Sequence, residues 1–422
     1  MRVLWFATNS ACYNNNHLKT SGYNGGGWMS SLQLEISKFP NIELGISFCM
    51  DNQPFKTTQN NVIYYPVSSH IKSLKNKILD LIYYKDETRD NILWRFYIDK
   101  FKEIILDFKP DIIEVFGSEL YTGLSAISAK ELKIPCVLHI QGILGPYQNV
   151  FLPPTFSNLN FITSQGFKNI YSNFQYLVYW NRSCYRERAI LESVPNVIGR
   201  TDWDMKISNI YNNNVKYYYG GEILRSCFYE ESKRILPTSN KIISIISFPL
   251  YKGYDVILKT AYILKYQLCV DFEWEIYGNP NHHYIDSHLN LNHKDLNIKL
   301  CGVASAVQIK DALLNSTVYF QSSYIENSPN TLAEAQILGI PVVATNVGGT
   351  SSLVKHGETG YLFPCTEPHI GAFYINELIK DKSLNQRIGE DAKAESTIRH
   401  NKNTIVNNLI STYSEIINKY SN

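Results

Sequence analysis

The sequence predicts an α/β protein built from two Rossmann-like, doubly wound domains that face a central crevice. Short apolar runs typical of buried parallel strands alternate with helical patterns along the whole chain. At 422 residues the chain is too long for one ordinary hydrophobic core. Each half carries its own set of alternations, which favours two sheets over one large sheet. Ligands of such sheets bind at the carboxyl ends of the strands, in the crevice.

The elements follow from hydrophobic periodicity, taken in chain order. In the first half, apolar runs predict strands at residues 2–7, 43–48, 112–116, 136–140 and 197–199. Helical patterns there cover residues 28–38 and 94–108. In the second half we expect strands at residues 241–247, 273–277, 299–302, 318–321, 342–345 and 361–363. The helices between and after them are expected at residues 254–265, 306–315, 330–338 and 370–380.

The domain boundary is expected near residues 220–240, where the segment GGEILRSCFYEESKRILPTSN interrupts the periodicity. Residues 1–230 and 231–400 then form the two domains. Residues 401–422 are amphipathic and predict a helix that could pack back on the N-terminal domain.

Composition excludes several classes of function. A net charge of +2 argues against a dedicated nucleic-acid binder. The eight cysteines are scattered with no C-x-x-C pair, which is typical of reduced thiols in a cytoplasmic protein. The first ten residues are too short and too polar for a secretory signal, and no apolar run predicts a transmembrane helix. Residues 71–108 mix basic and apolar residues; they predict either a packed helix with a solvated face or peripheral contact with the inner membrane face.

The segment SSYIENSPNTLAEAQILGIPVVATNVGG carries the main candidate site, because Glu326 and Glu334 bracket a helix start. Ser328 is a good N-cap, and Pro329 suits the first helical position. Glu334 lies about a turn and a half inside the helix, where side chains lean back toward the N-terminus. Both carboxylates can therefore approach one helix mouth.

Free backbone amides at Asn330 and Thr331 would make that mouth an anion site. Carboxylates accept hydrogen bonds from hydroxyl pairs, so the combination indicates sugar, diphosphate and ribose held side by side. A solvated helix cap would show the same two glutamates. The glycine pair Gly348-Gly349, after the strand at 342–345, would let the backbone approach a ligand closely.

The run from residue 322 to 364 closely resembles the donor-binding core of retaining glycosyltransferases of the GT-B fold, family four. The shared features, in order, are E-N-S-P-N-T-L-A-E-A, G-I-P-V-V-A-T, G-G and G-E-T-G-Y-L-F. The resemblance implies that Glu326 faces the donor sugar and that Glu334 accepts hydrogen bonds from the ribose. It also implies that residues 1–230 bind the acceptor and residues 231–400 the nucleotide sugar.

The resemblance further implies that the amides between the two glutamates touch the sugar and the diphosphate. This chain has Pro329 where the family usually has glycine. Asn330 or Thr331, beside Ser328, must then serve instead.

Lys252-Gly253 resembles the pair that neutralises the donor diphosphate in the family. The arginine that the family usually carries five or six residues earlier is absent here, where Ile246 and Ser247 stand. Arg225 is a candidate substitute, although an ordinary surface arginine is the alternative.

Two features of the first half complete the candidate site. Gly26 and Gly27 belong to a glycine triplet before Trp28, and the resemblance places such a loop opposite the diphosphate; a loop without a ligand is the alternative. His139 ends a predicted strand at the crevice, and similar enzymes carry a histidine there that contacts the donor sugar. A structural histidine would also fit. Glu114 and Glu119 could line the acceptor side.

The triplet Asp202-Trp203-Asp204 is a D-x-D, which holds a divalent metal in another glycosyltransferase fold. We expect it to cap the next helix instead. The resemblance favours a metal-independent enzyme without a cofactor, because Lys252 and helix dipoles supply positive charge.

Together these features predict a retaining glycosyltransferase that moves a sugar from a UDP- or GDP-sugar to a glycan or lipid-linked acceptor. Bacterial surface polysaccharide synthesis is the expected setting. Two alternatives stay open. The missing arginine would suit a nucleotide-sugar-binding scaffold without turnover, and a sugar-nucleotide epimerase would use His139 in proton transfer.

Overall fold

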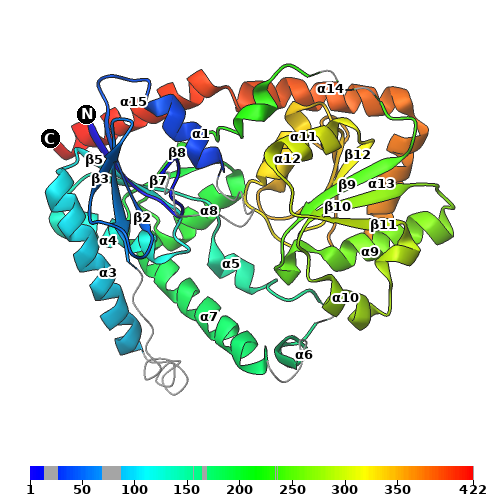
Figure 1. Cartoon of the computed structure of the whole chain (residues 1–422), viewed down its shortest axis with the longest axis horizontal. Coiled ribbons are helices and arrows are strands. Elements are labelled where there is room, and N and C mark those ends of the chain that lie inside the picture. The colour runs from blue at the N-terminus through cyan, green and yellow to red at the C-terminus, as the bar shows by residue number, and fades with distance from the viewer. Residues whose placement is uncertain are drawn as a thin grey trace.

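The protein folds into two α/β lobes that lie side by side, as the computed structural model shows (Figure 1). The structure describes residues 1–13, 27–68, 87–154, 156–163, 169–232, 234 and 236–421. Gly26 and residues 71–86 of the basic stretch predicted at 71–108 therefore lie outside the described residues. Among the residues that the structure describes, no helix has the length and apolar character needed to cross a membrane.

The N-terminal lobe is built on an eight-stranded sheet with the order β3-β4-β2-β1-β5-β6-β7-β8. All neighbouring pairs are parallel except β3 with β4. Every residue of the central strand β5 is buried, as expected where helices cover both faces of a parallel sheet. The strands are β1 (Arg2–Phe6), β2 (Glu43–Cys49), β3 (Thr57–Gln59), β4 (Val62–Val67), β5 (Ile112–Phe116), β6 (Cys136–His139), β7 (Asn196–Gly199) and β8 (Lys216–Tyr219).

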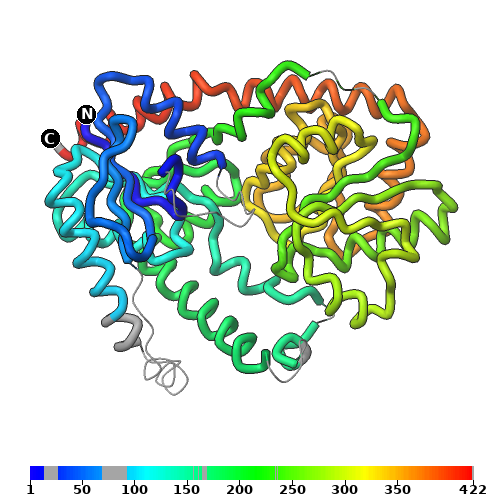
Figure 2. Tube along the Cα trace, in the orientation of Figure 1, coloured from blue at the N-terminus to red at the C-terminus, as the bar shows by residue number. Residues whose placement is uncertain are grey.

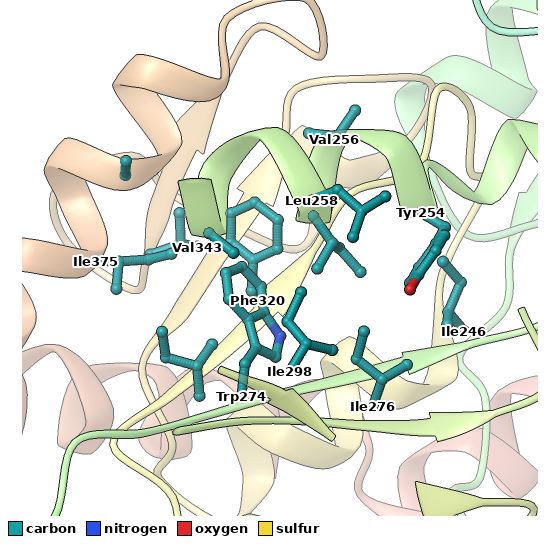
Figure 3. Close-up of a cluster of buried hydrophobic side chains, with 14 of the residues drawn as sticks. Ile246, Tyr254, Val256, Leu258, Trp274, Ile276, Ile298, Phe320, Val343 and Ile375 are labelled. Atoms are coloured by element: carbon teal, nitrogen blue, oxygen red, sulfur yellow. The ribbon is translucent and has the colours of Figure 1, made fainter. Parts of the chain in front are cut away.

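The C-terminal lobe is built on a six-stranded parallel sheet with the order β11-β10-β9-β12-β13-β14. Its core packs helix α9 onto the strands, with Trp274 and Phe320 between them at a ring distance of 5.1 Å (Figure 3). The Trp274 indole N–H donates to Ser244 Oγ at 3.1 Å, which satisfies a buried donor. The strands are β9 (Lys241–Ile246), β10 (Glu273–Gly278), β11 (Ile298–Gly302), β12 (Val318–Gln321), β13 (Val342–Thr345) and β14 (Tyr361–Phe363).

Helices connect the strands of both lobes and cover their faces (Figure 1). In the N-terminal lobe they are α1 (Gly27–Ile36), α3 (Glu87–Phe108), α4 (Ser125–Leu132), α5 (Leu144–Gln148), α6 (Asn158–Thr163), α7 (Ile170–Ser193) and α8 (Asp202–Tyr211). From the C-terminal lobe onward they are α9 (Tyr254–Tyr262), α10 (His282–Leu289), α11 (Ala306–Leu314), α12 (Asn330–Ile337), α13 (Pro368–Lys380), α14 (Lys382–Arg399) and α15 (Lys402–Ser421).

The chain crosses between the lobes more than once. Helix α15 returns to the N-terminal lobe and lies near β1, so both labelled ends of the chain are on one side (Figure 2). Its residues Leu409 and Tyr413 are buried in the same cluster as Trp5. In the opposite direction, Phe151 and Phe156 follow α5 but pack into the core of the C-terminal lobe.

The predicted fold class is confirmed, and each strand expected from the sequence is present with ends within one residue. The sequence did not predict β3, β4 and β8. Pro66 lies inside β4, and proline argues against a strand interior. Strand β8 is a partly exposed edge strand with the sequence KYYY, which has no alternation to detect.

Candidate functional site

A cavity of about 860 Å³ opens where the carboxyl ends of strands from both sheets meet. The C-terminal lobe contributes residues that follow β9 and β12 and the first residues of α12. The N-terminal lobe contributes the start of α1 and residues that follow β6 and β7. This is the position where paired doubly wound sheets bind ligands. Of the predicted residues, those brought together in its lining are Gly27, Arg225, Lys252, Glu326, Ser328, Asn330, Thr331 and Glu334.

Lys252 and Glu326 form an ion pair in the cavity wall, with Lys252 Nζ 2.6 Å from Glu326 Oε1. Ser323 Oγ donates to the same carboxylate oxygen at 2.8 Å. Gly253 has φ +76°, and a Cβ there would lie 2.0 Å from the carbonyl oxygen of Ser322. Only glycine allows this approach, which holds Lys252 against the end of β12.

The glycine pair after β13 packs closely on the protein backbone, and neither glycine is among the residues that line the cavity. A Cβ on Gly348 would lie 1.9 Å from the carbonyl oxygen of Glu326, and one on Gly349 would lie 2.3 Å from that of Asn327. The Gly349 N–H also donates to the Glu326 carbonyl at 2.9 Å. The pair therefore fixes the loop that carries Glu326.

Glu334 is paired with Arg225, whose Nε and Nη2 donate to the two carboxylate oxygens at 2.6 and 2.7 Å. Glu334 is 1% exposed. Burial raises the pKa of its carboxyl, and the hydrogen bond and charge of Arg225 oppose that rise. A Cβ on Gly27 would lie 3.0 Å from Arg225 Cγ, so the small residue leaves room for the arginine stem. Arg225 is thus a cavity residue held between both lobes.

Helix α12 begins at Asn330, as the hydrophobic periodicity predicted, but its N-cap lies one residue later than the capping signals suggested. Pro329 is the N-cap residue, with ψ 114°, and no side chain caps the helix. The Pro329 carbonyl accepts the first helical bond, from Ala333 N at 3.2 Å, so Pro329 and not Ser328 takes the capping position. A residue before proline is also disfavoured in the helical region. Asn330 still opens the helix at the cavity, where the first amides have no partner within the helix.

Side chains of Asn330 and Thr331 are held by buried neighbours. Asn330 Nδ2 donates to Glu222 Oε1 at 3.0 Å, and Thr331 Oγ1 lies 2.8 Å from the Tyr319 hydroxyl. The other oxygen of Glu222 pairs with Arg200. The helix mouth is therefore linked to the N-terminal lobe through a carboxylate.

Sequence reasoning missed Arg200, Glu222 and Asn327. Arg200 lines the cavity, is 6% exposed, and its Nη2 donates to the Ile140 carbonyl at 3.1 Å. Asn327 connects the lobes, accepting from Thr201 Oγ1 at 2.8 Å and donating to the Gln141 carbonyl at 3.2 Å. Arg200 directly follows β7, and a charged residue at the carboxyl end of a parallel strand was the available signal.

His139 lies behind the cavity wall and does not line it. Its ring centroid is 5.9 Å from that of Trp28, which does line the cavity. The imidazole is 2% exposed; Nδ1 lies 2.8 Å from Glu114 Oε1, and Nε2 is buried without a hydrogen-bond partner among the described residues. Glu114 is fully buried and also accepts a hydrogen bond from the Tyr413 hydroxyl of α15. It therefore does not line an acceptor surface, contrary to the expectation from the sequence.

Two further predicted acids, Glu119 and Asp204, accept hydrogen bonds from the protein backbone. The carboxylate of Glu119 accepts from the Gly142 amide at 2.7 Å, and burial raises its pKa. Asp204 forms a capping box with Thr201 at the start of α8, as expected for the D-x-D triplet. Among the residues that the structure describes, no three His, Cys, Asp or Glu side chains are grouped so as to hold a metal ion.

Residues 228–395 match the model of the family described as glycosyl transferases group 1. The C-terminal lobe belongs to this family. Within the curated relatives, this group 1 lobe is similar to the capsular polysaccharide biosynthesis glycosyltransferase CapM of Staphylococcus aureus, with 31% identity over 103 residues. That alignment covers 24% of this chain and only 27% of CapM.

Solved structures extend the likeness to both lobes. Sucrose-phosphate synthase from Thermosynechococcus elongatus superposes with a TM-score of 0.69 over 99% of each chain, at 13% identity. HepE from Anabaena, in complex with UDP and glucose, superposes with a TM-score of 0.63 over 98% of this chain and all of that one, at 16% identity. The arrangement of the group 1 lobe and its N-terminal partner is therefore the GT-B fold.

Proposed function

We propose that the protein is a retaining glycosyltransferase that uses a UDP- or GDP-sugar and a hydroxyl acceptor. The observation that carries the proposal is a single cavity between the lobes, lined by the pairs Lys252–Glu326 and Arg225–Glu334 and by the mouth of α12. Cations and free amides bind a diphosphate, and carboxylates accept hydrogen bonds from sugar hydroxyls. All of these groups face the same space.

The proposed roles follow from position. Glu326 would accept hydrogen bonds from the donor sugar, and Glu334 from the ribose, since each carboxylate oxygen can accept more than one hydrogen bond. Lys252 and the first amides of α12 would stabilise negative charge on the leaving diphosphate. His139 would influence the sugar indirectly, through the Trp28 ring that lies between it and the cavity. We propose no metal or cofactor, because these groups supply the positive charge.

The proposed reaction is front-face displacement. The acceptor hydroxyl oxygen bonds to the anomeric carbon as the bond from that carbon to the diphosphate oxygen breaks. The acceptor proton passes to the departing diphosphate, and the anomeric configuration is retained. CapM acts in capsular polysaccharide biosynthesis by name, which supports a bacterial surface glycan as acceptor, free or lipid-linked. We place the enzyme in the cytoplasm, with contact at the inner membrane face as an option for a lipid-linked acceptor.

The test is release of nucleoside diphosphate from UDP- and GDP-sugars in the presence of a glycan primer from bacterial cells. Glu326→Ala should abolish transfer, whereas Glu334→Ala should mainly weaken donor binding. Glu358→Ala is the matched control, since Glu358 is exposed in the turn before β14 and does not line the cavity. Unchanged kinetics in both site variants would refute the assigned roles.

Two outcomes would redirect the proposal. Donor binding without release on any acceptor would favour a scaffold, which the absent arginine at Ser247 motivates. Conversion of one nucleotide sugar into its epimer, without an acceptor, would favour an epimerase.

A further inference from the structure

A second cavity, of about 620 Å³, lies among α5, α6 and α7. Its volume falls within the range of small-molecule sites. Seven of its described lining residues are apolar or aromatic, and the other four are asparagine or glutamine. None of the described lining residues is ionisable. The first cavity, in contrast, is lined by the charged pairs Lys252–Glu326 and Arg225–Glu334.

This lining matches the chemistry of an uncharged sugar. A sugar ring offers apolar C–H faces, which pack on aromatic rings, and hydroxyl groups, which exchange hydrogen bonds with carboxamides. A charged ligand would be desolvated there without a counter-charge. The carboxamides of Gln148 and Asn181 are exposed at the edge of the cavity and bond to each other, so they can exchange hydrogen bonds with the hydroxyl groups of a ligand whose ring packs on the apolar lining.

Trp180 and Tyr251 separate the two cavities. Trp180 lines the second cavity, with its ring centroid 4.9 Å from that of Phe151 and 6.1 Å from that of Tyr251. Tyr251 lines the first cavity and directly precedes Lys252. A ligand in the second cavity would thus lie one aromatic wall away from the donor.

We propose that the second cavity binds a neutral glycan segment of the acceptor, a subsite that rests on the proposed transferase function. The amides would bond its hydroxyls, and the aromatic side chains would pack on its ring. The segment next to it would reach past Tyr251 to present the attacking hydroxyl.

The test uses the full chain and a panel of neutral probes: maltotriose, cellotriose, mannobiose and N,N′-diacetylchitobiose. Binding is followed by saturation-transfer NMR and calorimetry. Val178→Trp fills the cavity with the indole rings, which take the space that a glycan would need. This variant should therefore weaken glycan binding about tenfold or more. Asn181→Leu removes one amide at an exposed position and should weaken it about fivefold. Tyr179→Leu, on the same helix and outside the lining, is the matched control and should bind as wild type.

A second measurement separates this inference from the proposed function. Thermal shifts with UDP-glucose and GDP-mannose report donor binding alone, and they should be equal in wild type, Val178→Trp and Asn181→Leu. If nucleotide sugars bind but no neutral glycan does, or if Val178→Trp binds glycan as wild type does, the subsite is refuted. Tight binding of n-decanol that Val178→Trp abolishes, without glycan binding, would assign the cavity to an acyl chain and also refute it. If no nucleotide sugar binds, the proposed function fails instead.

Discussion

Replacing Arg225 with methionine separates the structural and ligand-binding roles of the buried pair with Glu334. Methionine keeps an unbranched stem beside Gly27 but removes both hydrogen bonds, at 2.6 and 2.7 Å. Glu334 is then left 1% exposed without a counter-charge. Arg225 also lines the cavity, so the change should weaken donor binding.

The magnitude follows from burial. Breaking a buried ion pair on one side costs about 3–5 kcal/mol. The Arg225 side chain is 19% exposed, so we expect the lower end, about 3 kcal/mol of unfolding free energy. Burial raises the pKa of Glu334, and removing Arg225 raises it further. A fold that holds a carboxyl with a raised pKa becomes less stable as pH rises and the carboxyl ionises. The stability lost in Arg225→Met should therefore be larger at pH 8 than at pH 5.

Urea unfolding at both pH values measures the loss, and calorimetry measures the nucleotide-sugar Kd, expected to rise about tenfold. The double variant Arg225→Met/Glu334→Gln should recover about 2 kcal/mol, since the orphan charge is gone. Arg387→Met is the control: Arg387 forms an exposed i,i+4 pair with Asp391 at 3.5 Å, worth about 0.5 kcal/mol or less. A loss below about 1 kcal/mol for Arg225→Met, equal at both pH values, would refute the reasoning.

Two further predictions concern buried polar groups of the N-terminal lobe. Burial raises the pKa of Glu187 to about 7, above its ordinary value of 4.5, so its carboxyl stabilises the fold below pH 4.5 and this contribution is lost as pH rises through 7. In urea unfolding, the stability of Glu187→Gln relative to wild type should therefore be higher at pH 8 than at pH 5, by up to about 3 kcal/mol of unfolding free energy. The same stability difference between variant and wild type at both pH values would contradict this. Tyr413→Phe leaves Glu114 without one donor and Trp5 Nε1 without its acceptor at 3.1 Å. We expect a loss of about 2 kcal/mol or more, and a loss within 0.5 kcal/mol would show that the network is not stabilising.

The extent of prediction from sequence depended on how locally each feature is encoded. The carboxylates Glu326 and Glu334 lie eight residues apart in one continuous run, so helix signals and family resemblance located them together. Arg225 lies 109 residues before its partner Glu334, and no local pattern joins them. Arg200 directly follows a predicted strand, and that local signal was not used; its partners Ile140 and Glu222 lie elsewhere in the chain.

The N-cap of α12 and the surroundings of His139 could not be predicted from local sequence rules, for another reason. Because proline has no N–H to leave unpaired, it can stand either at the N-cap or at the first helical position. The path of the chain that enters from Asn327 decides which of the two positions Pro329 takes. His139 was correctly placed at a strand end. The ring of Trp28, from helix α1, separates His139 from the cavity, and only the tertiary packing reveals this.

The return of α15 to the first lobe reverses the order in which the chain can finish folding. Trp5 and Tyr413 share a hydrogen bond across 408 residues, and the helix buries Leu409 against the same strands. At about 5–20 residues per second, a ribosome would need roughly 20–80 s to deliver the second residue after the first. The C-terminal lobe is synthesised in between. The N-terminal lobe, although translated first, is therefore completed last, and its apolar face requires protection for the whole of that interval.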